Sequence, residues 1–114
     1  MQQQRFELSG YKGMWLFAMF DLPTDTTEDI RNYTRFRKTL LQLGFDMLQF
    51  SVYARYCADE DASKIHRRRA RQARPPKGHV RVLAVTDHQF GKMEVYMGKK
   101  REQTETPPDQ MLLL

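Results

Sequence analysis

The sequence predicts an α+β fold in which one antiparallel sheet is covered by two helices on a single face. Apolar or alternating segments typical of strands recur around two segments of helical periodicity. Their order is strand, helix, strand, strand, helix, strand, followed by one extra short strand. The chain has 114 residues, of which 40% are apolar and 29% charged, which suits one globular domain with one core.

The first strand is predicted over residues 14–21, "MWLFAMFD". Seven consecutive apolar residues are typical of a strand buried on both faces. The run ends abruptly at Asp21, and Pro23 cannot donate to a sheet ladder, so a turn follows. Residues 1–13, which precede the strand, are mostly polar and are interpreted as an N-terminal extension.

The first helix is expected to start with a capping box formed by Asp25 and Glu28. Gly44 stands where a helix C-terminus is commonly capped. The apolar residues that recur at helical spacing, and that should pack, are Ile30, Tyr33, Phe36, Leu40 and Leu43. The cations on the opposite side are Arg31, Arg35 and Lys38.

Residues 45–57 are rich in aromatic and β-branched residues but are too long for one flat strand. We expect two short strands joined by a kink or bulge near residues 49–51. The second helix is predicted from about residue 60 to 74, where Pro75 and Pro76 stop it. A strand over residues 80–87, a turn over 88–92 and a short strand over 93–97 complete the pattern.

Two split βαβ units that close on each other in this order form a ferredoxin-like βαββαβ sandwich. This domain is placed at residues 14–98, and residues 99–114 form a polar tail whose last four residues are apolar. The tail therefore resembles a partner-docking peptide. The second sheet face is expected to be uncovered and to carry Trp15, Phe17 or Phe50, which predicts a homodimer packed sheet to sheet.

Such a homodimer would explain Asp21. Two first strands would bring two Asp21 carboxylates close to the two-fold axis, where they repel each other unless a cation lies between them. One Mg²⁺ or Mn²⁺ ion shared by the pair would resolve the repulsion and could support phosphodiester hydrolysis. The alternative is that Asp21 is a solvated turn residue. The three histidines have no metal-ligand spacing with one another or with Cys57.

Positive charge is concentrated on the two helices. The formal net charge is +5, and residues 64–74 contain six cations and no acid. Such clustering is typical of a surface that binds nucleic-acid phosphates. The predicted nucleic-acid-binding residues are Arg31, Arg35, Lys38, Arg67, Arg68, Arg71 and Arg74.

Four stretches, in order, resemble a known family: "MWLFAMFDLPT", "RNYTRFRKTLLQLGF", "LQFSVYARYC" and "PPKGHVRVLAVTDHQF". Together they are similar to CRISPR-associated protein two, most closely to members from type II systems. The resemblance covers about residues 14–97 and implies a ferredoxin-like homodimer. It also implies that Asp21 is the Mg²⁺ ligand and catalytic residue, that Ser51 is an accessory catalytic residue, and that residues 93–97 contribute to dimerisation.

The same resemblance implies a role in spacer acquisition and a metal-dependent endoribonuclease activity. The homodimer would bridge the integrase, CRISPR-associated protein one, and would bind DNA and also RNA. An adaptor without hydrolytic activity remains an alternative, because the sequence offers one convincing metal carboxylate and no obvious general base. An RNA-recognition module is disfavoured, because residues 80–87 contain no aromatic residue on which a base could stack.

A membrane partner is not expected. The longest apolar run is seven residues, far short of the ~20 that span a bilayer. Cys57 is the single cysteine, so no internal disulfide can form and a reducing compartment is expected. These observations, together with the resemblance, predict a cytoplasmic protein of a prokaryote.

Overall fold

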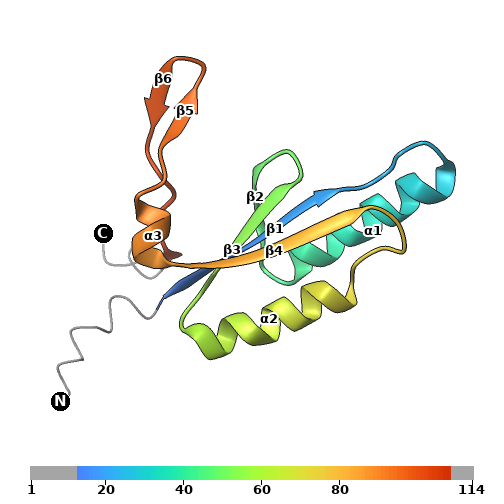
Figure 1. Cartoon of the computed structure of the whole chain (residues 1–114), viewed down its shortest axis with the longest axis horizontal. Helices are drawn as coiled ribbons and strands as arrows, with labels where there is room; N and C mark the ends of the chain where they lie inside the picture. The colour runs from blue at the N-terminus through green and yellow to red at the C-terminus, as the bar shows by residue number, and fades with distance from the viewer. Residues whose placement is uncertain (1–12, 109–114) are drawn as a thin grey trace.

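The computed structural model describes residues 13–108 (Figure 1). The elements are β1 (Met14–Asp21), α1 (Thr27–Gln42), β2 (Asp46–Gln49), β3 (Val52–Cys57), α2 (Glu60–Gln72), β4 (His79–Thr86), α3 (Asp87–Gly91), β5 (Val95–Met97) and β6 (Lys100–Glu102). The first four strands form an antiparallel sheet in the order β2-β3-β1-β4, and α1 and α2 lie on one face of it. The predicted α+β, ferredoxin-like fold is confirmed.

The core between the sheet and the two helices follows from alternation along β1. Leu16, Ala18 and Phe20 point toward the helices and are fully or almost fully buried. Phe36 and Leu40 of α1 pack in the same cluster, as the helical spacing predicts. Ala70, Phe45, Tyr53 and Cys57 complete it. Ile30 was expected to pack as well, but it is 52% exposed because it lies on the outer surface of α1.

The opposite sheet face is covered at one end, which corrects the prediction for Trp15 and also for Phe17, whose ring is partly buried 5.7 Å from that of Phe90. Residues 87–91 form the helix α3 instead of the expected turn, with a capping box between Thr86 and Gln89. The Phe90 ring stacks on Trp15 with a centroid distance of 3.9 Å. The Trp15 Nε1–H also donates to Asp87 Oδ1 at 2.8 Å. Trp15 is therefore only 6% exposed.

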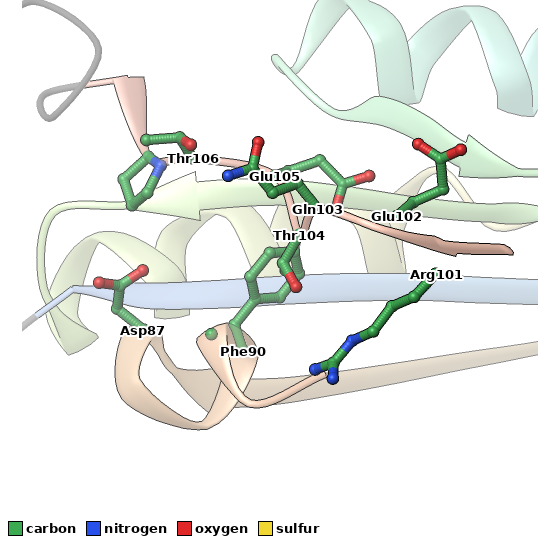
Figure 2. A pocket seen from close by; sticks show the side chains of 10 residues that line it. Asp87, Phe90, Arg101, Glu102, Gln103, Thr104, Glu105 and Thr106 are labelled. Atoms are coloured by element: carbon green, nitrogen blue, oxygen red, sulfur yellow. The ribbon is translucent and has the colours of Figure 1, made fainter. Parts of the chain in front are cut away.

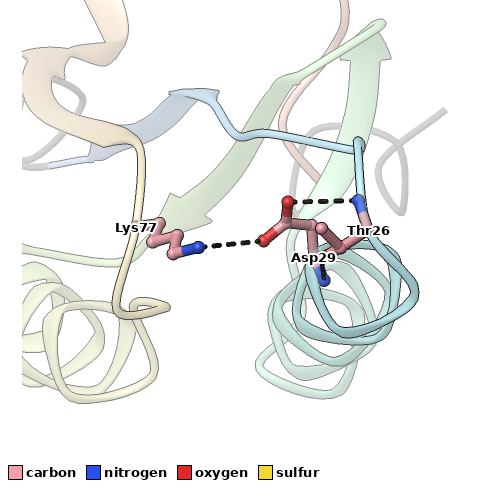
Figure 3. Close-up of polar contacts among 3 residues, drawn as sticks. All are labelled: Thr26, Asp29 and Lys77. Atoms are coloured by element: carbon pink, nitrogen blue, oxygen red, sulfur yellow. Dashed lines mark hydrogen bonds and ion pairs between the residues drawn. The ribbon is translucent and has the colours of Figure 1, made fainter.

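The start of α1 differs from the prediction by one residue. Thr26 is the N-cap: its hydroxyl accepts the Asp29 backbone N–H at 3.0 Å, and the Asp29 carboxylate accepts the Thr26 N–H at 3.3 Å (Figure 3). The expected pair Asp25 and Glu28 does not form the box, because Asp29 is the buried acid of the first turn and also pairs with Lys77 at 3.8 Å. Gly44 follows the C-cap with φ of 90°, as predicted.

Residues 45–57 form two strands, as predicted, but a turn joins them and the chain reverses direction there. β2 and β3 pair antiparallel around a tight turn at Phe50 and Ser51, with Ser51 at φ 65°. A register shift between Met47 and Gln49 provides the expected irregularity. Phe50 is 78% exposed at the turn and its ring lies 6.4 Å from Tyr33 of α1. Phe50 is thus not on the uncovered sheet face, where it was expected.

The C-terminal part forms a separate β-hairpin that projects from the main sheet (Figure 1). β5 lies within the predicted strand 93–97, and β6, which was not predicted, lies within the segment interpreted as a tail. The hydroxyl of Thr104 donates to the Met93 carbonyl at 2.8 Å and ties the chain after β6 to the start of the hairpin. The apolar end, residues 111–114, lies outside the described residues, as do residues 1–12 of the extension.

Candidate nucleic-acid interface and Asp21 site

Asp21 lies on the sheet face that α1 and α2 do not cover. Alternation along β1 places it on the same side as Phe17 and Met19 and opposite the buried Phe20. β1 pairs with Thr86, next to α3, at its start and with His79 at its end. Phe90 of α3 packs on Trp15 and reaches Phe17, so four residues of strand, about 14 Å, separate Asp21 from the covered part of this face. Asp21 is exposed.

A surface hollow of about 190 Å³ surrounds Asp21 and is lined by Met19, Phe20, Asp21, His79 and Arg81. His79 is the direct cross-strand partner of Asp21, and Arg81 is the partner of Met19. Directly opposed residues of an antiparallel pair point to the same face. A carboxylate, an imidazole and a guanidinium therefore share one hollow.

The side chains of Asp21, His79 and Arg81 form no hydrogen bond or ion pair with any residue that the structure describes. Their polar groups are thus available to a ligand. The sequence reasoning missed His79 and Arg81, although the alternation "HVRV" after Gly78 places both on the face opposite the buried side.

Gly78 holds the backbone at this end of the sheet. It has φ of 89°, and a Cβ atom there would lie 2.6 Å from the Asp21 carbonyl oxygen and 2.8 Å from Leu22 Cδ2. Only glycine permits both this conformation and this close approach without strain. The start of β4 is therefore packed directly against the residue that carries the candidate site.

Ser51 lies near the same end of β1. The Phe20 backbone N–H donates to the Ser51 carbonyl at 3.1 Å, which joins the β2–β3 turn to the residue before Asp21. The positive φ of Ser51 is a conformation that non-glycine residues seldom adopt. Through this backbone contact the structure brings Ser51 close to the end of the strand where Asp21 is found.

One chain alone supplies too few ligands to hold the predicted metal ion. Among residues 13–108, no group of three or more His, Cys, Asp or Glu side chains could hold a metal ion. Asp21 alone supplies a carboxylate of the type that Mg²⁺ prefers, and Arg81 adds a cation to the same hollow. One protomer therefore offers part of a site, which fits an ion whose other ligands come from a second copy, water or phosphate.

The predicted cations of α1 lie on the helix layer. Arg31, Arg35 and Lys38 are exposed on the outer surface of the helix, with Arg35 Nη1 donating to Asn32 Oδ1 at 3.4 Å. Because α1 covers the sheet face opposite Asp21, these residues do not join the Asp21 hollow.

The predicted cations of α2 share that layer. Asp59 caps the helix by accepting the Ala62 N–H at 2.9 Å, and Ala70 packs against the sheet. Arg68, Arg71 and Arg74 are exposed and Arg67 is half-buried. The spacing of Arg67, Arg68 and Arg71 places them on one side of the helix, and Arg74 follows the C-cap Ala73. The structure thus divides the predicted site residues into an acidic position on one face and a cationic helix layer on the other.

Two other reactive groups are poor candidates for the site. Burial raises the pKa of the Cys57 thiol, and this effect outweighs the Arg55 charge, which lowers the pKa. A buried thiol with a raised pKa is a weak nucleophile. Burial also lowers the pKa of His66, as do the charges of Arg55 and Arg69. Both groups belong to the packing around α2 and β3, on the far side of the sheet from Asp21.

A larger hollow of about 620 Å³ lies elsewhere, between α3 and residues 101–107 (Figure 2). Asp87, Phe90 and Arg101 point into it. None of the predicted site residues lines this hollow. Asp87 is also engaged by the Trp15 indole, so its carboxylate contributes to the packing of α3.

The fold and these two surfaces define a class of protein: a small ferredoxin-like domain with an open carboxylate at the end of its first strand and a cationic helix layer. The model of the family described as CRISPR associated protein Cas2 matches residues 14–93, most of the chain. The chain belongs to the Cas2 family.

Individual relatives agree with this assignment. The chain is 50% identical over 100 residues to a protein of Parvibaculum lavamentivorans, a match that covers 88% of this chain and 99% of the relative. It is 42% identical over 106 residues to a protein of Flavobacterium psychrophilum, a match that covers 93% of this chain and 92% of the relative. It is 38% identical over 100 residues to a protein of Streptococcus mutans, a match that covers 88% of this chain and 91% of the relative. Each of these relatives is named CRISPR-associated endoribonuclease Cas2.

Within residues 13–108, no helix combines the length and the apolar character that crossing a bilayer requires.

Proposed function

We propose that this protein acts in CRISPR adaptation as a nucleic-acid-binding homodimer with a metal-dependent endonuclease activity centred on Asp21. The observation that carries the proposal is the exposed Asp21 at the end of β1, on the sheet face that α1 and α2 leave uncovered. The names of the relatives, which call them endoribonucleases, supply the reaction class. In this role the protein would work in the cytoplasm of a prokaryote.

Dimerisation is supported by apolar groups that one chain leaves in contact with solvent. Leu83 of β4 is 51% exposed and lies directly opposite Phe17, at the border of the part of this face that α3 covers. On the projecting hairpin, Tyr96 and Met97 are 55% and 69% exposed. A second copy packed sheet to sheet would bury Leu83, and the hairpin could then pair with the partner's sheet.

Asp21 would hold one Mg²⁺ or Mn²⁺ ion jointly with Asp21 of the partner subunit. When bound, such an ion polarises the phosphodiester and lowers the pKa of a water molecule. The protein's own part is to place two carboxylates on rigid strand ends, where their mutual repulsion favours cation binding. Ser51 would act as an accessory residue that orients the substrate at the end of β1.

The helix layer would bind the nucleic acid. Arginine and lysine contacts to phosphates supply affinity and register without reading the base sequence. Such a surface suits an incoming DNA fragment laid along the dimer, with RNA as a second ligand. The partner implied by the family is the integrase, CRISPR-associated protein one, which the dimer would bridge.

A second candidate function is an adaptor that binds DNA and the integrase but hydrolyses nothing. The observation that favours it is the incomplete donor set: the described part of one chain offers Asp21 without two further metal-binding side chains nearby. In this case catalysis would belong to the integrase.

The substitution Asp21→Asn separates the two functions. If the nuclease proposal is correct, hydrolysis of single-stranded RNA in Mg²⁺ or Mn²⁺ falls by at least about a hundredfold, because the amide cannot replace the anionic ligand. Asp25→Asn is the matched control, since Asp25 is also exposed and lies only four residues away, in the loop before α1. Its activity should equal that of the unchanged protein.

Spacer acquisition supplies the second readout. Retained acquisition by Asp21→Asn, together with lost hydrolysis, would assign the biological role to the adaptor. Equal hydrolysis by the unchanged protein and Asp21→Asn would refute the proposed site.

A further inference from the structure

We infer that Arg81 holds a phosphate group of the bound nucleic acid in the hollow beside Asp21. This inference rests on the proposed function, since it names a binding residue within the same site. It differs from the helix-layer prediction because Arg81 lies on β4, on the opposite face of the sheet.

The position of Arg81 follows from the strand register. Asp21 pairs with His79 and Met19 pairs with Arg81, so Arg81 is the diagonal neighbour of Asp21 on one face. Diagonal neighbours in an antiparallel pair lie about 7–8 Å apart at their Cα atoms. This separation leaves room for a ligand group between the carboxylate and the guanidinium, and the hollow of about 190 Å³ occupies that place.

The Arg81 side chain is also free to bind a ligand. Its guanidinium has no acidic partner among the described residues, although Asp21 lies nearby on the same face. By contrast, Lys77, two residues before β4, is paired with Asp29. A guanidinium offers a planar fork of donors that matches two oxygens of a phosphate.

The chemistry of the hollow explains why a cation is needed there. A phosphodiester that approaches Asp21 brings negative charge toward a carboxylate, which is unfavourable without compensation. Arg81 supplies that compensation from the adjacent strand, and His79 forms the wall directly opposite Asp21. Arg81 would thereby fix one phosphate close to the strand end.

The test is the binding of a fluorescently labelled 12-nucleotide single-stranded RNA, measured by anisotropy at several salt concentrations in EDTA. EDTA removes divalent ions, so the result does not depend on hydrolysis. We expect Arg81→Gln to weaken binding about five- to tenfold and to reduce the salt slope by about 0.7, the value for one phosphate contact on a single strand. The RNA affinity of Arg81→Lys should lie between those of the unchanged protein and Arg81→Gln, because lysine keeps the charge but lacks the planar fork of donors.

The matched control is Arg37→Gln, which makes the same change at an exposed position of α1 outside the predicted cationic side. We expect Arg37→Gln to change RNA affinity by less than twofold. Equal effects of Arg81→Gln and Arg37→Gln would overturn the inference and identify Arg81 as a solvated charge on an edge strand. Single-stranded DNA of the same sequence should show the same loss, and a loss confined to RNA would contradict a phosphate contact.

Two outcomes separate this inference from the proposed function. If the unchanged protein binds and Arg81→Gln binds equally well, only the inference fails. If the unchanged protein binds neither RNA nor DNA, both fail. A changed particle mass for Arg81→Gln in sedimentation would assign Arg81 to contacts between copies and would also overturn the inference.

Discussion

The availability of Asp21 depends on the strict alternation of β1. Phe20 is buried in the core, so the next residue must point to the other face, and there α3 is too distant to cover it. The apolar run therefore ends at Asp21 because this position faces solvent. The sequence singled out Asp21 as the residue that ends the apolar run, but it did not predict the two side chains beside it, because cross-strand register cannot be read from one strand alone.

A prediction at the residue scale concerns Gly78. Gly78→Ala should destabilise the fold by roughly 1–3 kcal/mol, because the new methyl group meets the Asp21 carbonyl and the backbone must leave its left-handed conformation. Chemical denaturation measures the loss. Gly98→Ala is the matched control, since Gly98 also has a positive φ but has open space around it.

Gly78→Ala should also weaken the proposed hydrolysis, since Asp21 moves with its backbone. The Gly98 variant should share only the conformational part of the destabilisation. If both variants lose the same stability, the close contact between Gly78 and Asp21 contributes nothing.

At the scale of single elements, the sequence identified β1, α1, α2 and β4 to within about two residues. These elements carry their own start and stop signals, such as Asp59 before α2 and Pro75 after it. The sequence did not predict α3 or β6. It predicted a kink at the position where the structure has the β2–β3 turn. α3 has five residues and is held by the stacking of Phe90 on Trp15, a contact between residues 75 positions apart (90 − 15) that no local pattern reveals.

The arginines of α2 can be tested for DNA binding by charge reversal. Arg67/Arg68/Arg71→Glu should reduce duplex DNA binding by at least about a hundredfold at low salt, because three phosphate contacts become repulsions. The matched control is Lys92/Lys99/Lys100→Glu, which changes exposed cations near the hairpin. Each variant replaces three positive charges by three negative ones and so takes the net charge from +5 to −1 (5 − 6).

The two triple variants therefore differ only in where the charge is changed. Anisotropy titrations against salt should show a flattened salt dependence for the α2 variant alone. Equal losses would indicate that overall charge, and not the α2 surface, determines binding.

At the scale of the whole molecule, the two sheet faces differ in how fully they are covered. α1 and α2 bury one face, whereas α3 and the chain after β6 cover only part of the other. This asymmetry is the basis of the proposed homodimer. The sequence predicted two helices on one face, but it did not predict that α3 covers part of the other. The extent of the cover was not predictable, since it depends on how far the C-terminal part folds back.

Leu83→Glu tests the homodimer. We expect the unchanged protein to sediment as two chains of 13.6 kDa and Leu83→Glu to sediment as one, because a buried unpaired carboxylate is costly at an apolar interface. Ile30→Glu is the matched control: Ile30 is 52% exposed, against 51% for Leu83, but it lies on α1. A monomeric unchanged protein, or an Ile30 variant that also dissociates, would contradict sheet-to-sheet packing.

The location of the helix cations and of Asp21 on opposite sides of the sheet has an evolutionary consequence. A single substitution at Asp21 would alter no residue of α1 or α2, and a charge change on those helices would alter no atom of the strand end. A lineage could therefore discard cleavage and retain attachment to nucleic acid. Descendants that share this architecture can be expected to diverge in chemistry while remaining alike as scaffolds.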